Sequence, residues 1–123
     1  MLQAYSSNLT VTVGQAIPFN SLALKKGCTV ELVTPTTLQF NKCGIYEVSC
    51  NISADAAVTV ELQKSGTTEP QSIQEGTNPN ISTLVVVDRD NSCNPCVIPV
   101  TAQVICNTAG TLSNVNIVVT KLR

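Results

Sequence analysis

The chain has 123 residues, including six cysteines and no histidine, and its formal net charge is −1 with only 12% of residues charged. This length fits a single domain with one hydrophobic core, covering residues 1–123. The missing histidine excludes Ser-His-Asp and Cys-His nucleophile systems and every His-based metal site. Lys and Arg are scattered rather than gathered in a basic stripe, which argues against nucleic-acid binding.

The N-terminal segment has none of the features of a signal peptide. Residues 1–7 contain no basic region and no long apolar run, and no window approaches the roughly 18–20 apolar residues of a membrane span. We therefore expect synthesis in a cytoplasm and no membrane span. Residues 1–12 are interpreted either as a first strand, since apolar residues alternate with threonines over 9–13, or as an anchor to a larger protein assembly such as a capsid.

Apolar residues at every second position predict a series of half-buried strands. The alternating segments are residues 9–13, 28–32, 44–54, 58–63 and 98–107. Gly, Pro and Asn turn signals separate them at short spacing, and no stretch has a sustained 3.6-residue period. The pattern predicts an all-β fold, a sandwich or barrel of about eight to ten short strands.

Two runs, residues 84–87 and 115–122, are apolar on both faces of the predicted strand. Such strands are usually covered on both sides. In a two-layer sandwich one side is the core, so the other side has to meet a loop, a partner or another copy of the chain. These runs are the best local indication of self-association.

The polar loops are the predicted binding elements, because surface loops often carry binding function. The longest polar segment is 67–80, and a second loop covers 88–95. The alternative is that segment 67–80 only connects two strands. The candidate binding residues are Glu69, Gln71, Gln74, Asn78, Asp88 and Asp90.

The acidic residues do not form a recognisable catalytic or calcium-binding pattern. Glu47 and Glu61 could be neighbours on one sheet face, as a glycosidase pair would need, but solvent-facing charges on strands explain them better. The segment that begins at Asp88 resembles the start of a calcium loop, yet Cys93 and Pro99 stand where that loop requires Gly and Glu. We therefore expect no enzyme and no cofactor.

The cysteines allow several interpretations. Cys93 and Cys96 form a Cys-x-x-Cys pair, but no second pair exists for zinc and an all-β chain lacks the helix of a redox site. They are weak metal candidates, and a local disulfide or free loop thiols fit better. Cys50 and Cys106 lie in apolar alternation and are predicted to be reduced core residues. Structural bridging among the others stays open.

The segment Phe40-Asn41-Lys42-Cys43-Gly44-Ile45-Tyr46-Glu47-Val48 resembles the signature of the C1q/tumour-necrosis-factor-like jelly rolls, where a strand-end Phe and a turn ending in Gly precede x-Tyr-x-Val. The flanking order is also similar, with strands near 16–19 and 29–32, a Val-x-Val-x-Leu-x-Lys-x-Gly hairpin at 58–66 and a final apolar strand at 115–122. The resemblance covers nearly the whole chain. It is closest in kind to the microbial branch, which includes domains of collagen-like spore-surface proteins and bacteriophage virion proteins.

The resemblance implies an antiparallel jelly-roll sandwich that forms a homotrimer, with apolar strand faces around the threefold axis and rim loops exposed. The trimer-interface candidates on this basis are Tyr46, Val48, Val115, Ile117 and Val119. The chain departs from the family in having few aromatics and no collagen-like Gly-x-y stalk. These departures leave the mode of attachment and the composition of the trimer core open.

The leading hypothesis is a non-enzymatic trimer that decorates a particle surface, with a phage virion as first choice, and whose exposed loops take part in host attachment. The second is a carbohydrate- or receptor-binding adhesion module of a cell or spore surface, which uses the same fold and puts function in the loops. An enzyme is the third and least favoured hypothesis.

Overall fold

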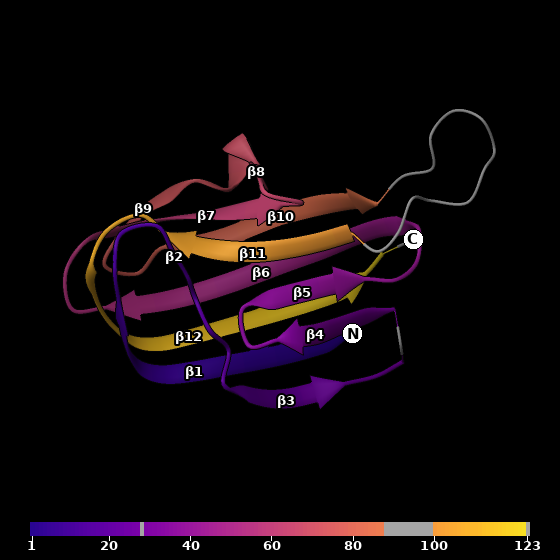
Figure 1. The fold of residues 1–123 in the computed structure, drawn as a ribbon, viewed down its shortest axis with the longest axis horizontal. Coiled ribbons are helices and arrows are strands. Elements are labelled where there is room, and N and C mark those ends of the chain that lie inside the picture. Colours follow the sequence, from indigo (N-terminus) through magenta and orange to yellow (C-terminus); the bar gives the residue numbers. More distant parts are fainter. Residues whose placement is uncertain (28, 88–99, 123) are drawn as a thin grey trace.

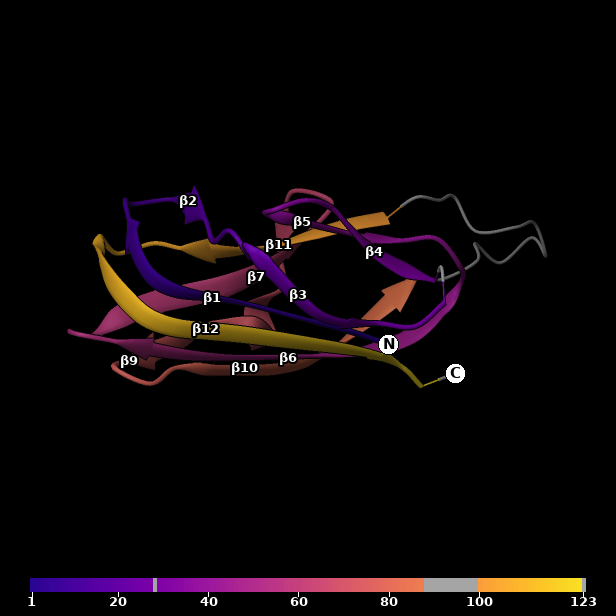
Figure 2. The ribbon, with the colours of Figure 1, turned by 90° about the horizontal axis from the view of Figure 1, so that it is seen from below.

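The computed structural model describes residues 1–27, 29–87 and 100–122, which form two antiparallel sheets packed face to face (Figure 1). Figure 2 shows the two layers from the side, with β10, β6 and β12 in one and β2, β5 and β11 in the other. The predicted all-β sandwich is confirmed. Nine strands have four or more residues, within the predicted eight to ten, and three shorter strands accompany them in the described part of the chain.

The strands are divided between two sheets. Sheet A has the order β10-β6-β12-β1-β3, and sheet B has the order β4-β5-β11-β7-β8, with β2 paired to β11 and β9 paired to β7. The elements are β1 (Leu2–Val11), β2 (Gln15–Ala16), β3 (Ser21–Lys25), β4 (Val30–Thr34), β5 (Thr37–Phe40), β6 (Gly44–Ala54), β7 (Val58–Lys64), β8 (Thr67–Thr68), the 3-10 helix η1 (Pro70–Ser72), β9 (Gln74–Gly76), β10 (Asn80–Val87), β11 (Val100–Cys106) and β12 (Gly110–Lys121).

The alternating residues of the sequence form the interface between the sheets. In β6, Tyr46, Val48 and Cys50 are completely buried, whereas Glu47 and Asn51 are exposed. The other long strands repeat this pattern, so the inward side chains of both sheets make one core. Its largest fully buried members are Tyr46, Phe40, Leu2, Ile17, Leu38, Leu62, Ile81, Leu112 and Ile117.

The β5–β6 connection is held by the segment that carries the family resemblance. The rings of Phe40 and Tyr46 lie 4.7 Å apart between centroids, tilted by 58°, a favourable aromatic arrangement. The Tyr46 hydroxyl donates a 2.6 Å hydrogen bond to the carbonyl of Lys42, which satisfies the polar end of a buried ring. Cys43, in the same connection, is disulfide-bonded.

The β7–β8 hairpin closes through two residues, Ser65 and Gly66, as the turn signal predicted. Both have positive φ, 51° and 81° respectively, which is the geometry of the tight turn that matches strand twist. The chain then passes through η1, where the buried Ser72 hydroxyl accepts a 2.8 Å hydrogen bond from the Leu62 N–H and donates a 2.6 Å bond to the Glu69 carbonyl. This hydroxyl fixes η1 against β7.

The N-terminal segment forms the first strand of sheet A. Strand β1 pairs with β12 from Leu2 to Val11 and with β3 over Leu2 to Tyr5. The first-strand interpretation therefore holds for residues 2–11, and attachment to a larger assembly stays a prediction.

Candidate interaction surfaces

The five predicted trimer-interface residues lie in the core of the single chain. Tyr46 and Val48 of β6, and Val115, Ile117 and Val119 of β12, all have 0% of their surface exposed. Their side chains pack against sheet B, so they cannot touch a second copy. The prediction placed these residues on the wrong face, because the more apolar side of a half-buried strand faces the core of its own chain.

The opposite side of these strands forms the outer A face, which is the set of outward side chains of β10, β6, β12 and β1. Its members are Asn80, Ser82, Leu84, Val86, Ile45, Glu47, Ser49, Asn51, Ser53, Asn114, Asn116, Val118, Thr120, Gln3, Tyr5 and Ser7. Asn116 is at its centre, between Asn51 and Tyr5, and its Oδ1 accepts a 3.1 Å hydrogen bond from Gln3. Glu47 carries the only formal charge in this set.

One of the two runs that are apolar on both faces, residues 84–87, lies in β10. Val85 and Val87 point into the core, while Leu84 is 51% exposed and Val86 is 42% exposed. Tyr5, on the β1 side of the outer A face, is 42% exposed. In the described part of the chain no loop covers Leu84 or Val86.

A surface pocket of about 460 Å³ lies at the β10 margin of the outer A face and is lined by Glu47, Gln71, Ser82, Thr83 and Leu84. We call it the edge pocket. Gln71 comes from η1, and its Nε2 donates to Thr83 Oγ1 (3.2 Å) and to Glu69 Oε2 (3.3 Å). The η1 segment therefore brings the predicted loop residue Gln71 into the pocket, and Glu69 lies beside it.

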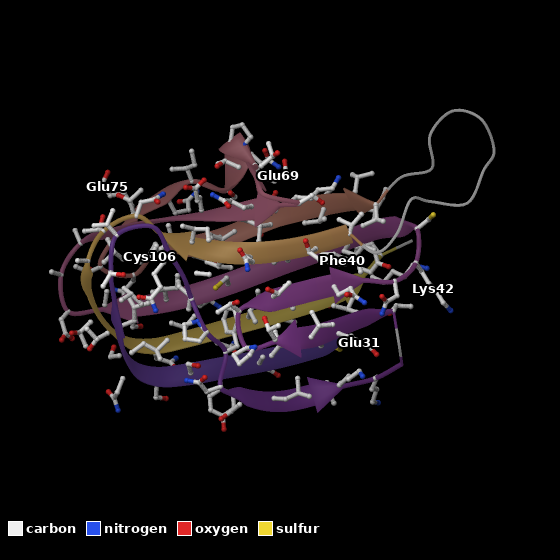
Figure 3. All side chains as sticks on the ribbon, in the orientation of Figure 1. Glu31, Phe40, Lys42, Glu69, Glu75 and Cys106 are labelled. Carbon is white, nitrogen blue, oxygen red and sulfur yellow. The ribbon has the colours of Figure 1, made fainter. Side chains whose placement is uncertain are left out.

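The other predicted loop residues are not brought together. Gln74, in β9, and Asn78, just after it, are exposed and do not line the edge pocket; Figure 3 shows Glu69 beside β8 and Glu75 near β9. Asp88 and Asp90 lie outside the described residues, as do the weak metal candidates Cys93 and Cys96. Sequence reasoning selected Gln71 and Glu69 but missed Ser82 and Leu84, because a strand pattern does not show which strand ends a sheet.

Glu47 and Glu61, the two carboxylates considered as a pair, are on different sheets. Glu47 is outward on β6 of sheet A, whereas Glu61 is on β7 of sheet B, largely buried and hydrogen-bonded to Asn107 Nδ2. They cannot act on one substrate. Within the described residues, no group of three or more Cys, Asp or Glu is placed to hold a metal ion, and no helix is long and apolar enough to cross a membrane.

Two of the cysteines are free thiols in the core, as predicted. Cys50 and Cys106 are both buried and unbridged. Burial removes the thiol of Cys50 from water and raises its pKa from 9.0 to about 12, because a thiolate is poorly solvated in an apolar core. Cys50 is therefore an unreactive packing residue and not a nucleophile.

Comparison with known proteins identifies the fold. The sequence matches no family model and no curated protein. Among solved structures, the globular domain of zebrafish complement 1qA protein has a TM-score of 0.75 at 7% identity, over 99% of this chain and 96% of that one. Rabbit GITRL has a TM-score of 0.61 at 14% identity, over 100% of this chain and 95% of that one. At these identities the likeness concerns the fold alone, and the chain has the two-sheet antiparallel fold of the C1q/tumour-necrosis-factor-like jelly rolls.

Proposed function

We propose that this chain is a non-enzymatic structural protein that forms a homotrimer and decorates the surface of a particle, as a phage virion decoration or fibre head. It would be made in the host cytoplasm and belong to the microbial branch of the jelly rolls. Its exposed loops would serve host attachment. The C1q/tumour-necrosis-factor-like fold supports self-assembly, since domains with this fold typically form homotrimers.

The observation that carries the proposal is the near absence of charge on the outer A face. The interior of a protein interface is depleted of charged residues, because each buried charge has to be desolvated. Sixteen outward positions on four strands hold one carboxylate, while the rest are amides, hydroxyls and apolar groups. Exposed Tyr5 and half-buried Val118 supply apolar area, and the amides can form hydrogen bonds across an interface.

An isosteric charge tests this proposal. Asn116→Asp places a carboxylate at the centre of the outer A face and can still accept the hydrogen bond from Gln3. Gln103→Glu is the matched control, because Gln103 is half-buried at the centre of sheet B, on β11, and makes one side-chain hydrogen bond, to Thr37. Native mass should be measured by light scattering over a dilution series.

The proposal predicts a trimer for the unchanged chain and for Gln103→Glu. The concentration at which half of the trimer dissociates should be at least tenfold higher for Asn116→Asp than for the unchanged chain. A chain that is monomeric at tens of micromolar, or a trimer that the two variants weaken equally, would contradict it. The circular dichroism of each variant shows that loss of mass is not loss of fold.

The second candidate is a carbohydrate- or receptor-binding adhesion module of a cell or spore surface. The edge pocket favours it, because the predicted loop residue Gln71 lines a concave site together with a carboxylate and two hydroxyls. Glycan-array binding that disappears in Gln71→Ala and persists in Gln74→Ala, at an exposed position outside the pocket, would support this candidate. Absence of binding to every glycan would count against it.

A further inference from the structure

The strand β10 is the terminal strand of sheet A, and its backbone shows which groups face the open edge. The carbonyl of Pro79, immediately before the strand, accepts a hydrogen bond from the Ile52 N–H of β6 at 3.1 Å. The carbonyl of Val86 accepts one from the Lys64 ammonium instead. Backbone groups alternate in direction along an antiparallel strand, so those of Ser82, Leu84 and Val86 point away from β6.

Lys64 protects only part of this edge. A lysine on an edge strand or against it is a common protection against unwanted strand pairing, and here it occupies the carbonyl of Val86. The outward backbone groups of Ser82 and Leu84 coincide with the edge pocket, which the same two residues line. The Leu84 carbonyl among them accepts a long hydrogen bond, of 3.5 Å, from Thr83 Oγ1. Among the described residues this side of β10 has no neighbouring strand, and a concave site lies at the same place.

The polar groups of the edge pocket are mostly hydrogen-bond acceptors. The Nε2 of Gln71 donates hydrogen bonds to Glu69 and Thr83. A carboxylate can only accept, so the amide nitrogen and not the amide oxygen of Gln71 has to face Glu69. The Oε1 of Gln71 is left as an acceptor. The carboxylate of Glu47 is exposed and has no hydrogen bond or ion pair among the described residues. Leu84 adds an exposed apolar wall.

A pocket with a carboxylate, an amide oxygen and an aliphatic wall is complementary to a cationic donor on an aliphatic stem. Lys and Arg side chains have this chemistry, since the methylenes pack on apolar surface while the charged head stays with the acceptors. A chain that pairs with β10 would also supply the missing backbone hydrogen bonds, as in strand addition to a sheet edge.

We propose that an extended segment of a partner polypeptide pairs with β10 through the backbone of Ser82 and Leu84, and places a Lys or Arg side chain in the edge pocket against Glu47 and Gln71. A second copy of this chain is a poor occupant. The edge strands β10, β4 and β8 contain no Lys or Arg, and the Lys25 ammonium of β3 pairs with Glu31 at 3.4 Å. The edge pocket lies at the β10 margin of the outer A face, whereas the proposed contact between copies is centred on Asn116. The proposal goes beyond self-assembly and does not require it.

The probe is a fluorescein-labelled heptapeptide of alternating Thr and Val with Lys at its centre, compared with the same peptide carrying norleucine, which keeps the stem and lacks the charge. Binding to the full chain is measured by fluorescence polarisation, and backbone amide shifts of Ser82 and Leu84 are followed by NMR. Glu47→Gln removes the charge and keeps the shape. Glu75→Gln is the control, an exposed glutamate on β9 outside the pocket.

We expect the Lys peptide to bind at least tenfold more tightly than the norleucine peptide, with shifts of the Ser82 and Leu84 amides. Glu47→Gln should reduce this ratio to about one, whereas Glu75→Gln should leave it unchanged. Equal binding of both peptides, the same loss in both variants, or no binding at millimolar peptide would overturn the proposal. The native mass of each variant, measured in parallel, separates failure of this site from failure of the trimer.

Discussion

Ile117 and Val118 are neighbours on β12 that point in opposite directions, and truncating each to alanine separates the core from the outer A face. Ile117 is completely buried between the sheets, whereas Val118 is half-buried on the outer side. If Ile117 lined a threefold axis, as the family resemblance implied, its truncation would weaken assembly. In the structure it should weaken folding.

The size of the two effects follows from burial. Truncation of a fully buried isoleucine to alanine removes apolar contacts and leaves a cavity, at a cost of roughly 2–5 kcal/mol. A 123-residue domain has a stability of about 6–18 kcal/mol, so the variant should fold and have a clearly lower denaturation midpoint. Val118→Ala should cost the isolated chain about 1 kcal/mol or less, because part of its side chain already meets water.

Urea denaturation followed by circular dichroism measures the folding term, and light scattering on dilution without denaturant measures assembly. Ile117→Ala should lower the free energy of unfolding by the amount above and leave the concentration of half-dissociation unchanged. Val118→Ala should leave the free energy of unfolding nearly unchanged and raise the concentration of half-dissociation. The reasoning is refuted if Ile117→Ala costs less than about 1 kcal/mol, or if it dissociates the assembly while Val118→Ala does not.

Three further predictions concern two hydrogen bonds and one buried thiol inside the fold. Tyr46→Phe keeps the ring and deletes the hydrogen bond to the Lys42 carbonyl, so it should lower stability by about 0.5–1.5 kcal/mol in urea titration, and an unchanged midpoint would show that the bond contributes nothing. Ser72→Ala leaves the Leu62 N–H without its side-chain acceptor and should cost about 1–3 kcal/mol, with loss of amide-exchange protection at Leu62; retained protection would contradict the role of this hydroxyl. The Cys50 thiol, with its pKa raised by burial from 9.0 to about 12, should resist alkylation at pH 8 until the chain unfolds, as peptide mapping would show. The folded chain holds the Cys50 proton more tightly than the unfolded chain, so the stability that this thiol contributes is complete below pH 9 and is lost as the pH rises toward 12. Cys50→Ala should therefore make stability decline less steeply between pH 9 and 12. An identical decline in both proteins would refute the assignment.

The layers of the fold could be predicted because the sequence repeats a strong local signal. The inward set of β6, from Tyr46 through Cys50, is visible as alternation, and the hairpin at Ser65 and Gly66 is visible as turn chemistry. Both depend on residues close in the chain. The buried free state of Cys50 and Cys106 followed from the same alternation.

The candidate surfaces could be predicted only in part, because they depend on which strands are neighbours. Alternation shows two faces of a strand without saying which face another chain would cover, so Tyr46 and Ile117 were assigned to the wrong side. The edge pocket requires β10 to end its sheet and η1 to lie beside it. Ser82 gives no sign of this in the sequence, whereas Gln71 could be found because it sits in a polar loop.

The central claim is that the outer A face is an interface between copies of this chain, and the native mass of the purified protein tests it most directly. Light scattering at micromolar concentration, with and without reductant, should give three times the 13.0 kDa mass of the chain in both conditions, because the proposed contact is non-covalent. A mass of one chain, or a larger mass that reductant abolishes, would contradict it.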